Sequence, residues 1–493
     1  MKKQYSATKD LIKSNKIISI VLLILLLASF VELYHVYKPL PEGTSIESPI
    51  YAVQEKDISF LYDLTYHSSN GSKIVSQEIF DSILALVNSS NSFLVFDMFL
   101  FNAGYSVNSE QRNITRELTS ALISKKQDSP NTFIHFTTDP LNTLYGSYPI
   151  KEHEDLKNAN ISFAYTNIPA LRDSSPLFSM FWRTYLQWFG VAGPEIVPNP
   201  IGGDKPISPF ALATLLNTKA NHRKLFVSDA SSGEARLLLT SANPHEASSK
   251  HSNIAFIVNS SALSKVALDS ERGIASLSNV NIPDLLPSVQ DASSSSPINL
   301  QFVSEGGILR SMLKDIRETS SGDKIELAMF YLSERTIIDE LVQASERGVQ
   351  VSLILDPNKD AFAREKNGIP NRPVANELVK RSKEKISIRW YDTKGEQFHT
   401  KMLIITKADG TMIVYGGSAN LTKRNIGDLN LEADLRISAP QDSALAKEIS
   451  SYFQRLWTNE DANFTLDFES YKDTSTTKYL IYRFQEFTGL SSF

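Results

Sequence analysis

The chain of 493 residues lacks cysteine altogether. Disulfide bonds, thiolate metal sites and cysteine nucleophiles are therefore excluded. An excess of positive charge is also missing, because 50 basic residues stand against 55 acidic ones and give a formal net charge of −5. Proteins that grip duplex nucleic acid are usually basic, so this balance disfavours a nucleic-acid partner.

Neither a glycine-rich nucleotide-binding loop nor a metal-ligand spacing stands out, and no cofactor is predicted. The composition, 42% hydrophobic and 21% charged, is that of an ordinary globular protein. Collagen, coiled coil and wholesale disorder are excluded on that ground. The length predicts roughly two to four domains, or two large ones.

An uncharged apolar run occupies residues 17–31. With Glu32 near the interface and an aromatic flank it extends to residue 37, which is about the length that a spanning helix needs. Five lysines and one aspartate precede the run, and lysine-rich flanks stay in the cytoplasm. We therefore predict an uncleaved single-pass anchor with a cytoplasmic N-terminus and the rest of the chain on the extracytoplasmic side. A cleaved signal peptide and a buried core helix are the alternatives.

The rest of the chain contains one unit twice. A helix-like stretch precedes an apolar run at residues 93–102, and the same order recurs before residues 325–332. Apolar runs that end in Asp-Pro follow at 133–140 and 349–357. Helical periodicity that alternates with continuous apolar strands predicts a parallel sheet buried on both faces in each copy. We expect two α/β sandwiches packed face to face.

The end of each copy carries the same polar residues at a fixed spacing of 177 positions. The pairs are His222/His399, Lys224/Lys401, Ser241/Ser418, Asn243/Asn420 and Asn253/Asn430. Residues i and i+2 of a strand point to the same side, so each histidine projects together with its lysine. One copy thus offers an imidazole, an ammonium group and an amide, which is half of a phosphodiester site. Two copies brought together would set two imidazoles on opposite sides of one phosphorus.

The duplicated pattern resembles the phospholipase D superfamily, whose repeated motif is His-x-Lys, four residues, Asp, then Gly-Ser-x-Asn. The resemblance covers about residues 75–460. The second half is most similar to bacterial cardiolipin synthase-like and phospholipase D-like members, through AMFYLSER, DPNKD, NGIPNRP and GEQFHTK. It implies an α/β protein of two tandem phospholipase D-like α/β/α sandwich domains, which form a pseudo-dimer with one shared active site behind the N-terminal transmembrane helix.

These observations divide the chain into seven segments. We expect a short basic cytoplasmic tail (1–16), a transmembrane anchor (17–37), a spacer and start of the first domain (38–74), the first domain (75–275, with an insertion at about 170–212), a linker (276–298), the second domain (299–460) and a C-terminal extension (461–493).

The resemblance implies a metal-independent, two-step displacement through a covalent phosphohistidine. His222 would be the nucleophile, as the first histidine usually is in the family, and His399 the general acid and base. The groups that would hold the non-bridging oxygens are Lys224, Lys401, Asn243 and Asn420. Supporting roles would fall to Asp229, Ser241, Ser418 and Glu432.

Two positions depart from the family pattern. Asp229 has Thr406 as its counterpart, with Asp409 close by in the following turn. Glu432 fills the place of an acid that orients an imidazole, yet the residue at the same spacing in the first copy is Ala255. We therefore expect weaker local support for the second motif. Any acid that orients the other histidine would have to come from elsewhere in the sequence.

The expected function is a membrane-anchored phosphodiesterase or phosphatidyltransferase that acts on a phospholipid, with an alcohol or water as acceptor. An anchored nuclease of the same superfamily and a binding protein that has lost its activity are the alternatives. A groove rich in basic side chains with a stacking aromatic would favour the nuclease.

Several patterns allow two interpretations each. Asp356 either bounds the pocket or caps the turn that follows it, and turn capping is favoured. The aromatic insert around Trp182 and Trp188 and the C-terminal stretch 479–487 either pack on the domains or contact the membrane, and packing is favoured for both. His245 and His251 lie near the first motif in the sequence and are candidates to line the pocket.

Overall fold

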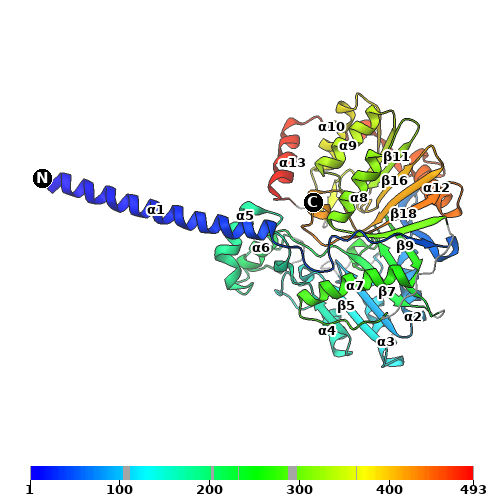
Figure 1. Cartoon of the computed structure of the whole chain (residues 1–493), viewed down its shortest axis with the longest axis horizontal. Coiled ribbons are helices and arrows are strands. Elements are labelled where there is room, and N and C mark those ends of the chain that lie inside the picture. Colours follow the sequence, from blue (N-terminus) through cyan, green and yellow to red (C-terminus); the bar gives the residue numbers. More distant parts are fainter. Residues whose placement is uncertain are drawn as a thin grey trace.

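The computed structural model describes residues 2–103, 111–200, 205–230, 233–286, 297–361, 364–491 and 493. Parts of the predicted insertion (201–204) and of the predicted linker (287–296) lie outside the described residues. Within the described part, the strands form two nine-stranded sheets and a small ribbon of β13 (Asp360–Ala361) and β14 (Arg364–Glu365). The two sheets lie against each other in the body of the molecule, and α1 extends away from it (Figure 1).

The first sheet has the order β19-β2-β9-β8-β7-β4-β5-β6, with β3 paired to β2. Its strands are β2 (Ile58–Ser68), β3 (Lys73–Ser76), β4 (Phe93–Met98), β5 (Phe133–Thr138), β6 (Ser162–Tyr165), β7 (Lys224–Asp229), β8 (Ala235–Thr240), β9 (Asn253–Asn259) and β19 (Ala462–Asn463). The second sheet has the order β1-β10-β18-β17-β16-β11-β12-β15-β20. Its strands are β1 (Tyr51–Val53), β10 (Ile298–Ser304), β11 (Lys324–Met329), β12 (Gln350–Leu355), β15 (Ile386–Tyr391), β16 (Lys401–Thr406), β17 (Thr411–Gly417), β18 (Ala433–Pro440) and β20 (Thr465–Asp467).

The internal duplication is confirmed by this topology, because seven consecutive strands of each sheet follow one order: β2-β9-β8-β7-β4-β5-β6 in the first and β10-β18-β17-β16-β11-β12-β15 in the second. The expectation of wholly parallel sheets is wrong, however. β4, β5 and β6 are parallel, whereas β4 pairs antiparallel with β7, and β7, β8, β9 and β2 continue antiparallel. Buried apolar runs look alike in parallel and in covered antiparallel strands, so the run itself does not give the strand direction.

Helices cover the outer face of each sheet, and one apolar core fills the space between the sheets. The helices are α1 (Lys2–Tyr37), α2 (Ile79–Ser89), α3 (Ile114–Asp128), α4 (Lys151–Asn158), α5 (Pro176–Phe181), α6 (Pro209–Leu216), α7 (Ser261–Leu277), α8 (Gly306–Arg317), α9 (Arg335–Glu346), α10 (Asn371–Arg381), α11 (Lys423–Ile426), α12 (Ala444–Thr458) and α13 (Thr476–Thr488). α2, α3 and α4 pack on the first sheet, and α8, α9 and α10 on the second. The central core joins residues of both sheets with α7 and α12, so the two halves share one interior.

α7 and α12 begin at side-chain caps. Ser260 Oγ accepts the backbone N–H of Leu263, and Ser443 Oγ accepts that of Ala446. Such a cap satisfies an amide that the first helical turn leaves unpaired. Each of these helices contacts strands of both sheets, α7 on β8 and β10 and α12 on β2 and β18. They therefore fasten the halves together along the seam.

The N-terminal helix contains the apolar stretch Lys16–Tyr37, 22 residues with a mean hydropathy of 2.6. By length and composition this stretch fits either a membrane anchor or a signal sequence. The C-terminal end of α1 is hydrogen-bonded to the first half. Asp173 N–H donates to the His35 carbonyl at 3.2 Å, and Lys38 Nζ donates to the Pro169 carbonyl at 3.2 Å. Glu32 is buried at the same junction.

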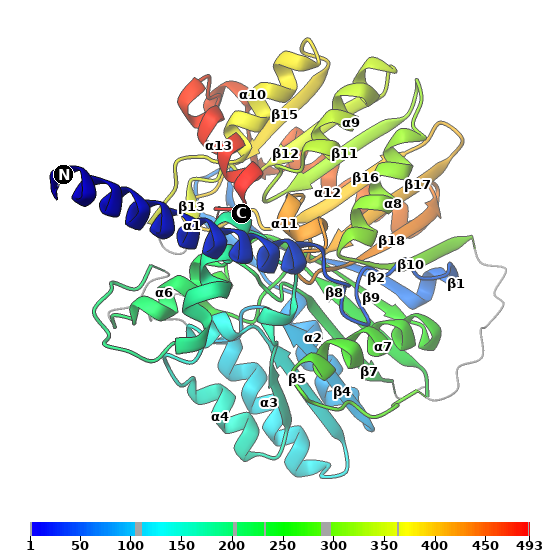
Figure 2. The same cartoon turned by 60° about the vertical axis from the view of Figure 1, so that its left-hand side comes forward.

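The predicted spacer does more than separate the anchor from the domains. β2 starts at Ile58, so the first sheet already contains strands ahead of residue 75, and β1 joins the edge of the second sheet. The predicted insertion contains α5, a π-helical turn η4 (Trp182–Leu186), a short 3-10 turn η5 (Gln187–Phe189) and the start of α6. α13 packs on α10 of the second half. Figure 2 shows α6 and α13 on the side from which α1 leaves the body.

Candidate active site

Both His-Lys pairs lie at the start of an antiparallel strand, β7 in the first half and β16 in the second. An Asp-Pro carboxylate fixes the residue in front of each histidine. Asp139 accepts the backbone N–H of Asn221 at 2.6 Å, and Asp356 accepts that of Phe398 at 2.8 Å. The parallel strands β5 and β12 end at these aspartates, so the carboxyl edge of each sheet carries the site, as open α/β sheets commonly do.

Asp356 also accepts the backbone N–H of Asn358 at 2.6 Å. The favoured prediction that Asp356 caps its turn is therefore confirmed. Asp139 does the same for the Leu141 N–H at 2.7 Å.

The two halves exchange backbone contacts at the histidines. His222 N–H donates to the Leu431 carbonyl at 2.9 Å, and Ser252 N–H donates to the Gln397 carbonyl at 3.0 Å. Asn221 forms an isolated parallel bridge with Leu431, as Ser252 does with Phe398. Each histidine segment is thus paired to a loop of the other half, which brings both motifs to the seam.

His222 is oriented by a carboxylate from the second half. Its Nδ1–H donates to Glu432 Oε1 at 2.7 Å, which leaves Nε2 as the atom with a free lone pair. Glu432 also accepts hydrogen bonds from Ser418 Oγ and Asn425 Nδ2. Because every one of these partners is a donor, the arrangement favours the ionised carboxylate, although burial raises the pKa of Glu432 well above its usual value.

His399 is oriented by an amide from the first half. Its Nδ1–H donates to Asn253 Oδ1 at 3.1 Å, and Ser241 Oγ donates to the same oxygen at 3.1 Å. Asn253 Nδ2 donates to the His251 carbonyl at 3.1 Å, which sets the orientation of the amide. The group that orients the second imidazole is therefore an amide and not an acid.

The strand register explains why the fixed spacing missed Asn253. Thr240 pairs with Ala255 in the first half, whereas Gly417 pairs with Asp434 in the second. Asn253 therefore corresponds to Glu432 and not to Asn430. The loop before β18 contains the helix α11, and the loop before β9 contains only a short 3-10 turn, η6 (Glu246–Ser248). The second copy is two residues longer at this point, so a single offset cannot align both sides of the loop.

Each lysine donates a hydrogen bond to the carbonyl of the histidine two residues before it, and each lies against an aromatic ring. Lys224 Nζ donates to the His222 carbonyl at 2.7 Å and lies 5.1 Å from the centre of the Phe99 ring. Lys401 Nζ donates to the His399 carbonyl at 2.9 Å and lies 5.4 Å from the ring of Phe330. The two phenylalanines follow β4 and β11 in a repeated Met-Phe pair, a signal that sequence reasoning could have used.

The same phenylalanines form part of the imidazole environment. The Phe99 ring centre is 4.6 Å from that of His222, and the Phe330 ring centre is 4.9 Å from that of His399. Burial lowers the pKa of both imidazoles well below the usual value, and the neighbouring ammonium groups lower it further. In the absence of an anion both histidines are therefore neutral at neutral pH.

Burial also disfavours the protonated, positively charged form of the two lysines. It lowers the pKa of Lys224 to about 7, and it lowers that of Lys401 well below its usual value, with Lys224 as a further cause. Two ammonium groups crowded into a buried site favour binding of an anion, because the anion restores their charge. A phosphodiester has the required negative charge.

Asn243 and Asn420 each follow their serine by two residues and are nearly fully buried, with 4% and 5% of their surface exposed. The amide oxygen of each has no hydrogen-bond partner among the described residues. Buried amide oxygens are normally paired, so both side chains are incompletely satisfied without a ligand. This unpaired oxygen occurs at the same place in both halves.

Asp229 lies at the far end of β7, away from the histidine. It accepts backbone N–H groups of Asn91, Ser92 and Phe93, which lead into β4. In the second half, Asp323 from the matching loop accepts the N–H of Ala408, after β16. In the first half the carboxylate comes from the end of β7, and in the second half it comes from the loop before β11. Asp323 therefore supplies the carboxylate that is missing at Thr406.

Asp409 does not take that role. It accepts the N–H of Thr411 within its own exposed turn. The expectation of weaker support for the second motif is therefore not met by the structure, because Asp323 ties the same two segments together.

Of the remaining histidines, His251 comes close to the site. Its ring centre is 5.9 Å from that of His399, and its Nδ1 accepts the Gln397 N–H at 3.2 Å. His245 instead contacts Ser248 Oγ. His135 and His153 are buried and hydrogen-bonded inside the first half, to groups other than the two His-Lys pairs.

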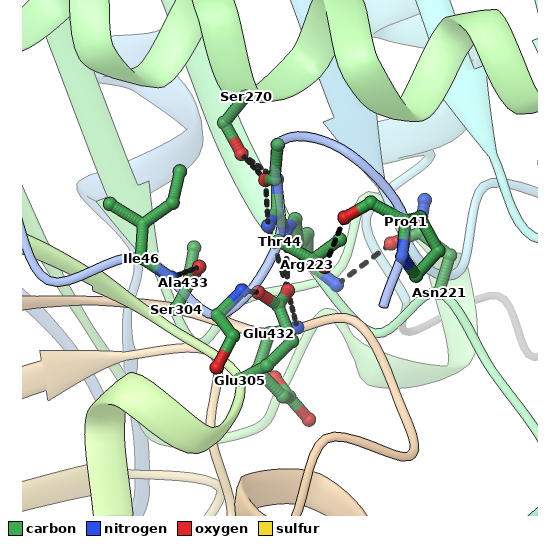
Figure 3. Close-up of polar contacts among 12 residues, drawn as sticks. Pro41, Thr44, Ile46, Asn221, Arg223, Ser270, Ser304, Glu305, Glu432 and Ala433 are labelled. Atoms are coloured by element: carbon green, nitrogen blue, oxygen red, sulfur yellow. Dashed lines mark hydrogen bonds and ion pairs between the residues drawn. The ribbon is translucent and has the colours of Figure 1, made fainter. Parts of the chain in front are cut away.

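A buried ionic clasp joins the two halves next to His222, and Figure 3 shows Arg223, Glu305 and Glu432 in it. Arg223, between His222 and Lys224, donates to Glu305 Oε1 at 2.7 Å and to Glu271 Oε1 at 2.8 Å. Glu305, from the second half, also accepts the backbone N–H of Glu432 at 3.0 Å. One carboxylate thus joins the strand of His222 to the residue that orients it.

The predicted spacer is tied into this clasp. Ser45 N–H donates to Glu305 Oε2 at 2.7 Å, and Ser270 Oγ donates to the Gly43 carbonyl (Figure 3). Gly43 has a φ of 80°, and a Cβ there would lie 2.6 Å from the Ser270 carbonyl oxygen. The close approach and the positive φ both require glycine. Sequence reasoning missed Arg223, Glu305 and the packing of the spacer.

A mostly apolar cavity of about 330 Å³ lies between the first sheet and the predicted insertion. Trp182, Gln187 and Val191 line it from the insertion, and Pro140 and Thr166 from the sheet side. Thr166 Oγ1 accepts Asn221 Nδ2 at 2.8 Å, so this wall is one hydrogen bond away from the residue before His222.

Comparison with known proteins finds a matching family model in the second half. Residues 312–457 match the family model described as cardiolipin synthase, PLD-like domain. No curated protein sequence matches the chain. The fold matches the crystal structure of phosphatidylserine synthase from Haemophilus influenzae Rd KW20, with a TM-score of 0.57 and 12% identity over 94% of this chain and 98% of that one. The phospholipase D family member Nuc from Salmonella typhimurium matches at a TM-score of 0.26 and 20% identity, over 34% of this chain and 97% of that one.

Proposed function

We propose that this chain, a member of the phospholipase D superfamily, is a membrane-anchored phosphatidyltransferase that uses His222 as its nucleophile. One observation carries the proposal: two His-Lys pairs meet at the seam of the halves, and each imidazole is held through Nδ1 by a side chain of the opposite half. Two imidazoles with Nε2 available and two ammonium groups suit in-line displacement at a phosphodiester.

In the first step, His222 Nε2 attacks phosphorus, and the bond from phosphorus to the leaving alcohol oxygen breaks. The negative charge of the bound phosphodiester favours the protonated form of His399, whose Nε2–H then gives its proton to that oxygen. The phosphohistidine formed on His222 carries a positive charge on its ring while Nδ1 keeps its proton, and the Glu432 carboxylate stabilises this charge. Asn253 is neutral and does not stabilise an imidazolium in this way, so His399 is the better proton donor. The asymmetry favours the assignment of attack to His222.

In the second step, His399 takes a proton from an incoming alcohol or water, whose oxygen attacks phosphorus. The bond from phosphorus to His222 Nε2 breaks, and the free imidazole is restored. Lys224 and Lys401 neutralise the non-bridging oxygens in both steps. These side chains carry the chemistry in our proposal, and we expect activity to persist in the presence of a metal chelator.

A phospholipid is the substrate that the surroundings favour. The apolar cavity beside Asn221 offers room for part of an acyl chain. The apolar helix α1 is bonded to the first half through Asp173 and Pro169, which favours an uncleaved anchor over a removed signal sequence. The basic tail ahead of the anchor favours a cytoplasmic N-terminus and an extracytoplasmic site.

The test uses detergent-solubilised full-length protein with labelled phosphatidylglycerol. Cardiolipin and glycerol, formed by the wild type and by neither His222→Ala nor His399→Ala, would support a transferase with an alcohol acceptor. His67→Ala, in β2, serves as the matched control and should keep full activity. Phosphatidic acid as the sole product would make water the acceptor and overturn the transferase proposal, although the two-step mechanism would stand.

The nuclease alternative is tested in the same assay. Cleavage of single-stranded DNA without any lipid product would overturn the lipid substrate. Inactivity on both substrates, with the protein folded, would contradict the catalytic proposal and leave the chain as a binding protein.

The cavity has a separate test. Thr214 lines the cavity, so Thr214→Trp should raise the KM for long-chain lipid and leave that for a short-chain analogue nearly unchanged. An equal change for both lipids would show that the cavity does not hold an acyl chain.

A further inference from the structure

Two apolar surfaces flank the point where α1 leaves the body. One consists of exposed residues of α5, η4 and η5: Leu177, Phe181, Tyr185, Trp188 and Phe189. The other consists of exposed residues of α13: Leu480, Ile481, Phe484 and Phe487. Trp188 is 75% exposed and Phe487 is 82% exposed. Single exposed apolar residues are common, but aromatic and aliphatic side chains gathered in one place mark an interaction surface.

The first surface is joined to the anchor itself. α1 packs against α5 and η4, and Ser29 Oγ lies 3.8 Å from Met180 Sδ. Below the surface, Arg183 and Lys219 share the buried carboxylate of Asp173 at 2.8 and 2.7 Å. These bonds hold η4 at the end of the anchor, so its apolar side chains lie next to the helix stretch that is long enough to span a bilayer.

The second surface has its direction fixed by the opposite face of α13. Tyr482 is fully buried, and its hydroxyl accepts a hydrogen bond from Arg335. Glu486 accepts from Ser333 Oγ at 2.7 Å. With these residues turned into the second half, the apolar residues of α13 face away from it. Figures 1 and 2 both show α13 and the α5–α6 region on the side toward which α1 extends.

We infer that these two surfaces insert shallowly into the bilayer leaflet that α1 enters. The inference rests on the proposed anchoring of α1. The occupant is a lipid surface because the first patch packs against the anchor and the end of α13 is bonded to the start of α5, where Ser175 Oγ donates to the Gly489 carbonyl at 2.6 Å. In addition, Trp, Phe and Leu are side chains that favour the interface. Together, α1 and the two surfaces would make three contacts with the membrane. Three contacts would fix the orientation of the seam relative to the bilayer, whereas α1 alone would leave the body free to tilt.

The inference differs from the sequence expectation, which favoured packing of both segments on the domains. Each segment does pack with one face, as Trp182 and Tyr482 show, but leaves a second apolar face uncovered. If both surfaces insert into the leaflet, the outer wall of the cavity lined by Trp182 and Gln187 would lie beside the lipid acyl chains.

The experiment measures tryptophan quenching by brominated phospholipids in full-length protein reconstituted into lipid nanodiscs. Trp188 is one of four tryptophans, so wild type is compared with Trp188→Phe. We expect a strongly quenched component in the wild type that Trp188→Phe loses. In the Trp188→Phe background, Phe487→Trp should restore quenching. Ile50→Trp in the same background is the matched control, because Ile50 is 59% exposed but precedes β1, which lies far from α1 (Figure 2).

Quenching of Trp188 and of Phe487→Trp no stronger than that of Ile50→Trp would overturn the inference. Quenching at one position only would remove the other surface from it. A concentration-dependent blue shift without quenching would assign the surfaces to contact between proteins, which also overturns it. Flotation with liposomes and the lipid assay are run beside these measurements. Protein that floats and transfers lipid while Trp188 stays unquenched separates failure of this inference from failure of the proposed function.

Discussion

The two halves of the molecule place equivalent residues on equivalent strands, yet they orient their histidines with different chemical groups. The first-half His222 rests on the carboxylate of Glu432, and the second-half His399 rests on the amide of Asn253. Both partners accept the Nδ1–H, so both rings keep the same orientation. Only the carboxylate can neutralise a positive ring. The two halves therefore share the geometry of the imidazoles but differ in the charge beside them, and this difference supports the proposed division of roles.

The far ends of the same strands differ in a simpler way. Asp229 reaches from the end of β7 to the loop before β4, and Asp323 reaches from the loop before β11 to the turn after β16. Either direction ties the same two segments together. Each half thus has one carboxylate that joins these two segments, but the two carboxylates stand at different positions of the repeated unit. This difference indicates that the carboxylate has a structural role and not a catalytic one.

The largest effects should come from the histidines. We expect His222→Ala and His399→Ala each to lower turnover of phosphatidylglycerol by on the order of 10⁴-fold. A lipid analogue with a p-nitrophenol leaving group separates them, because this group departs without a proton. His399→Ala should release one equivalent in a burst, and His222→Ala none. A burst from His222→Ala instead would reverse the assignment.

Loss of the carboxylate should come next. Glu432→Gln keeps the size of the side chain but removes the charge that stabilises the phosphohistidine. We expect kcat/KM to fall by about 10²-fold or more, as when an aspartate that orients a catalytic histidine is replaced. Steady-state kinetics measures it, and an unchanged kcat/KM would mean that the two halves are equivalent in charge.

The buried clasp between the halves should control stability. Glu305→Gln leaves the Arg223 guanidinium buried with one carboxylate partner fewer, and breaking a buried pair costs about 3–5 kcal/mol in the free energy of unfolding. Denaturant unfolding in detergent measures the loss. Arg310→Gln breaks the exposed pair with Glu47 and should cost at most about 1 kcal/mol. Equal losses would contradict the role of the clasp.

The two far-end carboxylates should be interchangeable in effect. Asp229→Asn and Asp323→Asn should each destabilise the protein by about 1–3 kcal/mol, because backbone donors lose a charged acceptor. kcat should stay within about twofold of the wild type in both. A large fall in kcat for Asp229→Asn alone would show that the first motif aspartate acts in catalysis.

The smallest effect should come from making the halves alike. Burial and Lys401 lower the pKa of His399, so the proton needed for the first step is lost as the pH rises. Asn253→Asp adds a negative charge beside this ring and raises its pKa, so the alkaline limb of the kcat/KM profile should move to higher pH. The profiles of wild type and variant, measured side by side, test it. A limb that moves to lower pH would contradict the proposed proton donor.

Sequence reasoning reached the two His-Lys pairs because their signal is local. The His-x-Lys spacing, the serines and Asn243 and Asn420 lie at the ends of strands whose sequences align without gaps, and apolar runs marked β4, β5, β11 and β12. It failed at Asn253, where a two-residue difference in the preceding loop shifts the alignment. Only the register of β8 with β9 and of β17 with β18 reveals the true counterpart.

Sequence reasoning alone was sufficient for the duplicated α/β unit, the apolar N-terminal helix and the residues that gather at the candidate site. The direction of the strands, the partner of each imidazole, the Arg223 clasp and the outward faces of the α5–η5 segment and α13 follow from the tertiary structure. These features depend on contacts between residues far apart in the chain. Local patterns record which side chains are apolar or polar, but not which distant backbone or side chain satisfies them.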